Sequence, residues 1–497
     1  MTRRSVHTVA ARLVVVTLVL VLGLAASSAT AATKPPRPRP PALRWTSCGK
    51  GFECARLRVP LDDILLNGPT ISLALVRLPA SDPQHRIGSL LVNPGGPGAS
   101  AVQFLEADAK ATLPAAVRAR FDIVAFDPRG VGGSAPVQCE SNLDPFYNLS
   151  FAPQTDAARQ ALVTGVEAYV AQCKAKSGTE LPYLSTERAA RDMDRVRAAL
   201  GDSKLTYLGY SYGTYLGSLY ADQYPTKVRA MVLDGSVDPA LSATTQEVQQ
   251  AQGFERDLDL FLQSCSADPS CTFHRSGDSA AAYDALRARV EQHPIPAGGA
   301  GSGRTLDATE FDIGVTQFLY SGRASYPDLA QALDSADRGN GAQLLQSSDQ
   351  YTGRRPDGSY DQGSLAAFLA IGCLDGPDVG GLAGLRTIEE QAAVVAPRLG
   401  RSVVNNSLAC AVWPVPTQVP PVPHAPGAPP ILVIGNTDDP ATPLTWAQGL
   451  SRELQSGVLL TVRSTQHTAY GNGNSCVDSL VNRYLIDRVP PAAGTRC

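Results

Sequence analysis

The stretch "LTYLGYSYGTYLG", residues 205–217, places Ser211 between two glycines, after an apolar run and before a helical pattern of small residues. A nucleophile elbow requires such a turn from strand to helix, because it lifts the serine oxygen clear of the sheet. The residues two before and two after the serine must be tiny, and Gly209 and Gly213 meet this need. A G-x-S-x-G pattern also arises by chance in a glycine-rich chain, so its surroundings decide its meaning.

Short β-rich runs alternate with helical patterns on both sides of this turn. Several runs are almost continuously apolar, as strands buried on both faces of a parallel sheet require. Residues 185–201 carry apolar side chains at helical spacing and end in Gly201, a typical helix C-terminus. The sequence therefore predicts an α/β fold with a mostly parallel sheet, with strands at 53–61, 70–78, 88–94, 121–127, 205–211, 230–236, 430–436 and 458–464.

Residues from about 241 to 405 show a different pattern. Helical segments follow one another there, and no alternating β-strand pattern is evident. A Pro-rich segment then leads back into the strand at Ile431. A helical block inserted between two strands of an α/β sheet is the arrangement of a cap over an active site. The expected organisation is a signal peptide at 1–31, a Pro-rich tether at 32–43, a core in two parts at 44–240 and 406–497, and a helical cap at 241–405.

The N-terminus is typical of an exported protein. Arg3 and Arg4 precede an apolar run at 13–26, which is shorter than the ~20 residues that a membrane-spanning helix needs. The small residues at 29–31 predict cleavage before Ala32, and an uncleaved anchor is the alternative. We expect a secreted protein without stable membrane insertion after cleavage.

The 10 cysteines are even in number and fall into local couples. About 945 pairings are possible, and the simplest joins nearest neighbours. Export disfavours the alternative of reduced core thiols, and the absence of any C-x2-C spacing argues against a metal site. The nearest-neighbour hypothesis pairs Cys48 with Cys54, Cys139 with Cys173, Cys265 with Cys271, Cys373 with Cys410 and Cys476 with Cys497.

Composition excludes one class of partner. The formal net charge is -3, and no long run of one sign occurs. Binding of nucleic acid requires a positively charged surface, so we expect no nucleic-acid partner. Nothing in the sequence implies a metal or an organic cofactor.

A serine near neutral pH needs a histidine base held by a carboxylate, and in this fold the chain order is serine, acid, histidine. His467 directly follows the last expected strand, where the mechanism needs the base. A surface-loop histidine is the alternative interpretation. The other histidines lie in the signal peptide, before the serine, in the cap or in the Pro-rich return: His7, His85, His274, His293 and His424.

The acid is expected after the strand that precedes the histidine strand. Asp438 and Asp439 stand there, whereas Asp234 and Asp238 occupy an alternative location after the sixth strand. We favour Asp439, with Thr442 as a hydrogen-bonding support for its carboxylate.

The oxyanion of an acyl-transfer reaction needs two preorganised N–H donors. The amide of Tyr212, directly after the serine, is one expected donor. The second is expected in "NPGGPGAS" at 93–100, whose glycines let amides point inward, and we favour Gly96. No Lys-Ser/Thr follows these glycines, so the stretch does not resemble a phosphate loop.

Several motifs together resemble a known family. "VNPGGPG", "FDPRGVGGS", "LGYSYGTYLGSLYADQYP", "VLDGSVDP" and "GNTDDPATP", followed by a histidine near the C-terminus, are similar to the secreted tripeptidyl aminopeptidase-like serine peptidases of actinobacteria, relatives of proline iminopeptidase. The resemblance runs from about Trp45 to the C-terminus. It implies an α/β-hydrolase fold with a helical cap and assigns nucleophile, acid and base to Ser211, Asp439 and His467.

The resemblance implies an exopeptidase that removes short peptides, commonly tripeptides, from free N-termini of peptides or proteins. Such an enzyme must bind the substrate ammonium, and an acidic group in or near the cap is the usual means. Asp375 is our candidate, with Glu255 and Asp257 as weaker ones. Asp127 and Arg129 are interpreted as structural residues beneath the oxyanion turn.

Two other functions remain open. A secreted carboxylesterase or lipase would use the same three residues, and a requirement for a free amine distinguishes it from a peptidase. A non-catalytic binding protein on the same scaffold usually lacks one of the three residues, whereas all three positions are filled in this chain.

Overall fold

The computed structural model describes residues 43–497 apart from 66, 299–302 and 362–363. The expected signal peptide and all but the last residue of the tether lie outside the described residues. Among the residues that are described, no helix combines the length and the apolar character needed to cross a membrane.

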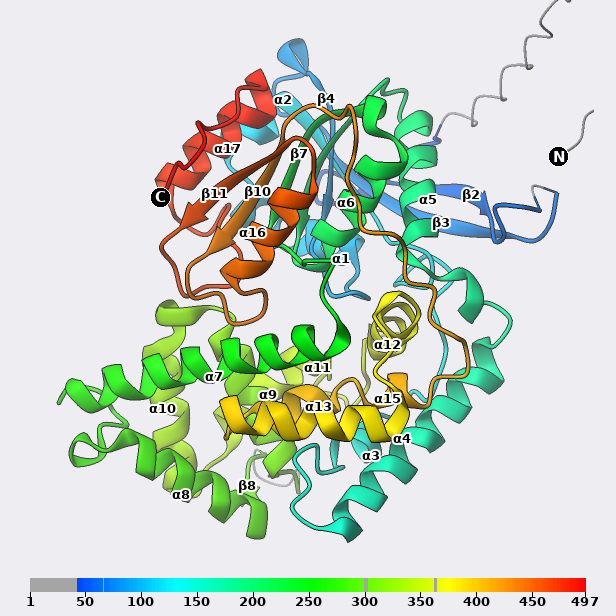
Figure 1. Cartoon of the computed structure of the whole chain (residues 1–497). Helices are drawn as coiled ribbons and strands as arrows, with labels where there is room; N and C mark the ends of the chain where they lie inside the picture. Colours follow the sequence, from blue (N-terminus) through cyan, green and yellow to red (C-terminus); the bar gives the residue numbers. More distant parts are fainter. Residues whose placement is uncertain (1–42, 66, 299–302, 362–363) are drawn as a thin grey trace, which may run out of the picture. The chain divides into compact units, whose positions relative to one another are not determined.

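In the described part of the chain, nine strands form one sheet in the order β1-β2-β3-β5-β4-β6-β7-β10-β11 (Figure 1). The pairs from β1 to β5 are antiparallel, and all pairs from β5 to β11 are parallel. Every predicted strand is confirmed, and only the exposed β1 was not predicted. The strands are β1 Thr46–Gly49, β2 Phe52–Pro60, β3 Thr70–Leu78, β4 Gly88–Asn93, β5 Phe121–Phe126, β6 Leu205–Tyr210, β7 Val228–Asp234, β10 Ile431–Asn436 and β11 Gly457–Val462.

The central strands are buried on both faces because helices cover both. Every residue of β5, β6 and β10 is buried. Along β4, Leu91 belongs to one apolar cluster while Leu90 and Val92 belong to the other, as the period of two predicts. The helices outside the inserted segment are α1 Ala101–Thr112, α2 Ala115–Arg120, α3 Asp144–Tyr147, α4 Asp156–Ser177, α5 Thr186–Ala199, α6 Tyr212–Gln223, α16 Leu444–Glu453 and α17 Ser475–Asp487.

The segment between β7 and β10 is mainly helical, as predicted. The expectation of no strands there is wrong in one detail, because Ile295–Pro296 (β8) pairs with Thr305–Leu306 (β9). These strands are too short to produce an alternating pattern in the sequence. The helices of this segment are α7 Ala243–Ala267, α8 Ser279–Gln292, α9 Ala308–Leu319, α10 Tyr326–Asp337, α11 Ala342–Thr352, α12 Ser364–Asp375, α13 Gly381–Val395, α14 Gly400–Asn405 and α15 Leu408–Ala411.

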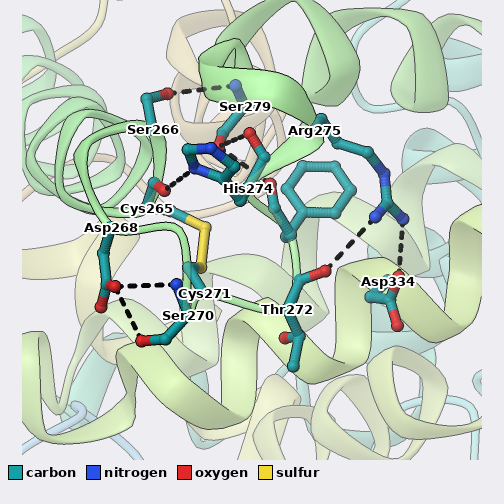
Figure 2. Close-up of a disulfide and its surroundings, with 11 residues drawn as sticks. Cys265, Ser266, Asp268, Ser270, Cys271, Thr272, His274, Arg275, Ser279 and Asp334 are labelled. Atoms are coloured by element: carbon teal, nitrogen blue, oxygen red, sulfur yellow. Dashed lines mark hydrogen bonds and ion pairs between the residues drawn. A yellow bond between two sulfur atoms is a disulfide. The ribbon is translucent and has the colours of Figure 1, made fainter.

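All five nearest-neighbour disulfides are present, so the pairing hypothesis is confirmed in this structure. Figure 2 shows the Cys265–Cys271 bridge, which closes the loop after α7. Inside this loop the Asp268 carboxylate accepts hydrogen bonds from the backbone N–H and the hydroxyl of Ser270, at 2.9 and 2.7 Å. The ring of His274 contacts the carbonyl of Cys265, with 3.0 Å between Nδ1 and O, so this histidine has a local structural contact.

Candidate active site

Ser211 lies at the sharp turn between β6 and α6. Its φ of 54° and ψ of -127° place it in a conformation that side-chain-bearing residues rarely adopt. A Cβ on Gly209 would lie 2.4 Å from the carbonyl oxygen of Gly213, and one on Gly213 would lie 2.8 Å from Asn93 Oδ1. Only glycine fits at both positions, which is the local reason that this sequence forms the turn.

His467 lies in the loop after β11 and contacts Asp439, which follows β10. Its Nδ1 is 2.9 Å from Oδ1 and 3.0 Å from Oδ2 of Asp439. Its other ring nitrogen, Nε2, is buried and has no hydrogen-bond partner among the described residues. His467 and Ser211 line the same cavity, and no other histidine is among its described lining residues. Because Asp439 contacts Nδ1, Nε2 is the ring nitrogen that remains available to accept a proton.

Of the four aspartates considered for the acid, Asp439 is the one that bonds to His467. Its Oδ1 also accepts the backbone N–H groups of Ala441 and Thr442, at 3.0 and 2.9 Å. The Thr442 hydroxyl donates to Oδ2 at 3.1 Å, as the sequence predicts. The other three bond elsewhere: Asp438 to Arg256, Asp238 to the backbone of Ala240, and Asp234 to the backbone of Ala469 and Tyr470.

Two opposing effects act on the pKa of the His467 imidazole. Burial lowers the pKa of the imidazole, but the charge of Asp439 and the hydrogen bond to it raise the pKa, and the net displacement is upward. The carboxylate therefore stabilises the imidazolium that forms when the ring accepts a proton.

Sequence reasoning missed two residues that hold the histidine loop. The side-chain amide of Asn436 donates to the carbonyls of Gln466 and Thr468, at 2.6 and 2.9 Å. The carbonyl of Tyr320 accepts the His467 N–H at 2.9 Å, and its ring packs edge-on against the imidazole. Asn436 is the last residue of a predicted strand, which places it near the loops that carry the site. Nothing in the sequence connects Tyr320 to a histidine so far along the chain.

The glycine turn after β4 packs directly against the serine turn. A Cβ on Gly95 would lie 2.8 Å from the Ser211 Cβ and 3.3 Å from the Tyr212 nitrogen. The Gly95 N–H donates a hydrogen bond to Asn93 Oδ1 at 3.0 Å, whereas the Gly96 N–H has no acceptor among the described residues. Tyr212 is the first residue of α6, where an N–H has no partner within the helix. Both expected donors line the cavity with Ser211.

Asp375, the last residue of α12, lies in the cavity wall and is only 6% exposed. Its Oδ2 accepts the backbone N–H of Thr186 at 2.8 Å and the hydroxyl of the same residue. That hydroxyl also shares a hydrogen bond with the Tyr212 hydroxyl, which links the acid to the serine turn. Oδ1 has no partner among the described residues. Burial raises the pKa of Asp375 to about 7.

The two weaker acid candidates are not among the residues that line the cavity. Glu255 accepts backbone N–H groups of Arg398 and Leu399 and pairs with the Arg398 side chain. Asp257 accepts the Tyr326 hydroxyl at 2.7 Å. The second carboxylate oxygen of Asp257 has no partner among the described residues, but neither Asp257 nor Glu255 lies in the cavity wall.

The cavity has a volume of about 1010 Å³, at the upper end of the range for small-molecule sites. Its described lining residues include no lysine and no arginine. Five lining residues are acidic, namely Asp238, Glu247, Asp312, Asp375 and Asp378. The cavity therefore suits a cationic ligand better than an anionic one.

Comparison with known proteins identifies the group to which these features belong. Residues 88–276 match the family described as "alpha/beta hydrolase fold", and residues 396–497 match the one described as "TAP-like protein". The serine protease Hip1 of Mycobacterium tuberculosis is 36% identical over 92% of this chain and 91% of its own length. The chain belongs to the tripeptidyl aminopeptidase-like α/β hydrolases.

Members of this family carry two kinds of name. A protein of M. tuberculosis called carboxylesterase B is 37% identical over 92% of this chain and 90% of its own length. The tripeptidyl aminopeptidase of Streptomyces lividans is 29% identical over 91% of this chain and 86% of its own length. Family membership makes the chain a serine hydrolase and leaves its substrate to the geometry of the cavity.

Proposed function

We propose that this chain is a secreted exopeptidase that releases short peptides, chiefly tripeptides, from free N-termini. The observation that carries the proposal is the Asp375 carboxyl, which is buried in the wall of the Ser211 cavity and has, among the described residues, one unpartnered oxygen and no basic side chain paired with it. An ammonium is the group that satisfies such a carboxylate, because it supplies both charge and donors.

The proposed reaction is acyl transfer in two steps. Ser211 Oγ attacks the scissile carbonyl while His467 Nε2 takes the hydroxyl proton, and the N–H groups of Gly96 and Tyr212 stabilise the oxyanion. His467 then gives this proton to the leaving amine. Water, deprotonated by the same ring, attacks the acyl-enzyme and releases the peptide. Asp439 orients the ring and stabilises its charged form.

The helical segment at 241–405 acts as a cap over this reaction, with the core at 44–240 and 406–497. This division is supported by the cavity lining, which combines Ser211 and His467 with residues of α7, α9 and α12. A cap that limits the depth of the cavity would fix the length of the released peptide. Secretion is supported by the five disulfides, which persist in oxidising compartments.

A carboxylesterase is the second candidate, and one relative carries that name. The same Ser211, His467 and Asp439 would serve it, so only substrate recognition separates the two functions. An ester without a cation leaves Asp375 unpaired in a buried site, which is unfavourable.

The test compares a tripeptide anilide that has a free N-terminus with its acetylated form. We expect cleavage of the free form, a loss of at least tenfold in kcat/KM on acetylation, and the same loss for the free form in Asp375→Asn. Fluorophosphonate labelling of the wild type and not of Ser211→Ala shows that the protein is a catalyst rather than a binder. Rapid hydrolysis of short acyl esters with no cleavage of either anilide would establish the esterase instead.

A further inference from the structure

Glu247 is a second carboxylate of the cavity wall that is not paired with a basic side chain among the described residues. It lies on α7 and is partly exposed towards the cavity that it lines. The hydroxyl of Ser407, just before α15, donates to its Oε1 at 2.6 Å. No arginine, lysine or histidine forms an ion pair with it among the described residues.

The other acids of the lining are already compensated or exposed. Asp312 receives two hydrogen bonds from the guanidinium of Arg287, at 2.6 and 2.9 Å. Asp238 accepts the N–H of Ala240 at 3.0 Å, and the positive charge of Arg452 acts to lower its pKa. Asp378 is exposed and accepts the N–H of Gly380 at 2.8 Å. Glu247 and Asp375 are therefore the two acids of the described lining that are not exposed and on whose pKa no positive charge acts.

The two carboxylates bond to different residues of the wall. Asp375 bonds to Thr186 beside the serine turn, whereas Glu247 bonds to Ser407. Burial raises the pKa of Glu247 to about 7, and the hydrogen bond from Ser407 opposes this rise. Two positive charges are needed to neutralise both carboxylates.

A peptide has one N-terminal ammonium, so its second positive charge comes from a side chain. We propose that Glu247 binds the ammonium or guanidinium of a lysine or arginine in the released peptide, while Asp375 binds the N-terminus. This inference rests on the proposed exopeptidase function. It makes Glu247 a specificity-determining residue that selects basic peptides.

The test uses three pairs of tripeptide anilides with free N-termini, in which one position at a time is lysine or methionine. The two side chains have similar length and differ in charge. We expect the wild type to prefer lysine at one position by at least tenfold in kcat/KM, which corresponds to about 1.4 kcal/mol. In Glu247→Gln this lysine-to-methionine ratio falls close to one, and in Glu247→Asp it is partly retained.

Glu390→Gln is the matched control, because Glu390 is an exposed residue of α13 whose one ion pair among the described residues is with Arg386. We expect this variant to keep the wild-type ratio at every position. The inference is overturned if the wild type prefers lysine at no position, or if Glu247→Gln lowers kcat/KM of both members of a pair equally.

A separate measurement distinguishes this inference from the proposed function. If no anilide is cleaved, the exopeptidase proposal fails, and binding of the same tripeptides as amides to Ser211→Ala is measured by calorimetry. Tighter binding of the lysine peptide that disappears in Ser211→Ala/Glu247→Gln supports the Glu247 site. Equal binding of both peptides to Ser211→Ala overturns it.

Discussion

The Asp439–His467 pair determines in which protonation state the proposed base rests. His467 must be neutral to accept the Ser211 proton, and its pKa is raised because the Asp439 carboxylate outweighs the effect of burial. Below this pKa the ring is charged and inactive, so activity rises as the pH increases through it. The acidic limb of kcat/KM is therefore expected above the ordinary histidine pKa of about 6.5.

Replacing Asp439 by asparagine tests this arrangement at one residue. The loss of the charge removes the largest effect that raises the pKa of His467 and leaves only the smaller effect of Asp234, so the acidic limb moves to lower pH. The amide also favours the wrong tautomer, and kcat/KM falls on the order of 10⁴-fold. The measurement is kcat/KM against pH for both proteins, with Asp438→Asn as control. A limb that stays in place in Asp439→Asn would argue against the assigned acid.

Secondary-structure elements are joined in this protein at a few close contacts. The glycines beside Ser211 let β6, α6 and the end of β4 meet without side chains between them. The Cys373–Cys410 disulfide ties α12, which carries Asp375, to α15, and both cysteines line the cavity. This bridge holds the wall that carries the proposed amine site.

Removing this disulfide tests its role. In Cys373→Ser/Cys410→Ser we expect a loss of about 4 kcal/mol in unfolding free energy, because the bridge closes a loop with a sequence separation of 37. KM should also rise as the wall loosens. Cys48→Ser/Cys54→Ser is the control, since its separation of 6 predicts a loss of only about 2 kcal/mol and neither cysteine is among the described lining residues. Urea unfolding and KM measure both effects, and equal losses in the two variants would contradict the expectation.

Across the whole molecule, charge is distributed unevenly with respect to the cavity. The chain has 43 basic and 46 acidic residues, yet none of the basic ones is among the described residues of the lining. Since burial weakens screening, the negative charge inside the cavity acts on any substrate that enters.

We therefore expect the protein to discriminate against acidic peptides. Replacing glutamine by glutamate in a tripeptide anilide adds a like charge to the cavity and should lower kcat/KM at least tenfold. Salt should restore little of this loss if the charge is repelled inside the cavity, and much of it if repulsion acts only at the surface. Equal kcat/KM values for the two peptides would show that the cavity charge does not act on substrates.

Much of the scaffold follows from the sequence. The turn at Ser211 and the eight predicted strands depend on local steric limits and on periodicity, so they can be predicted from the amino-acid sequence alone. The place of His467 after the last strand follows from the order of elements along the chain. The nearest-neighbour cysteine pairs are local as well. Only β1 and the short β8–β9 pair were missed, because neither is long enough to show a pattern.

The sequence favoured Asp439 among four aspartates that follow suitable strands, and the tertiary structure shows that its carboxylate is the one in contact with the His467 ring. Only the tertiary structure brought Tyr320 to the histidine and enclosed Glu247 in the same cavity as Asp375. Glu247 and Ser407 are 160 residues apart in the chain, and no local preference encodes such a contact. Local geometry can be read from neighbouring residues, whereas the unpaired charge of a cavity depends on every element that folds around it.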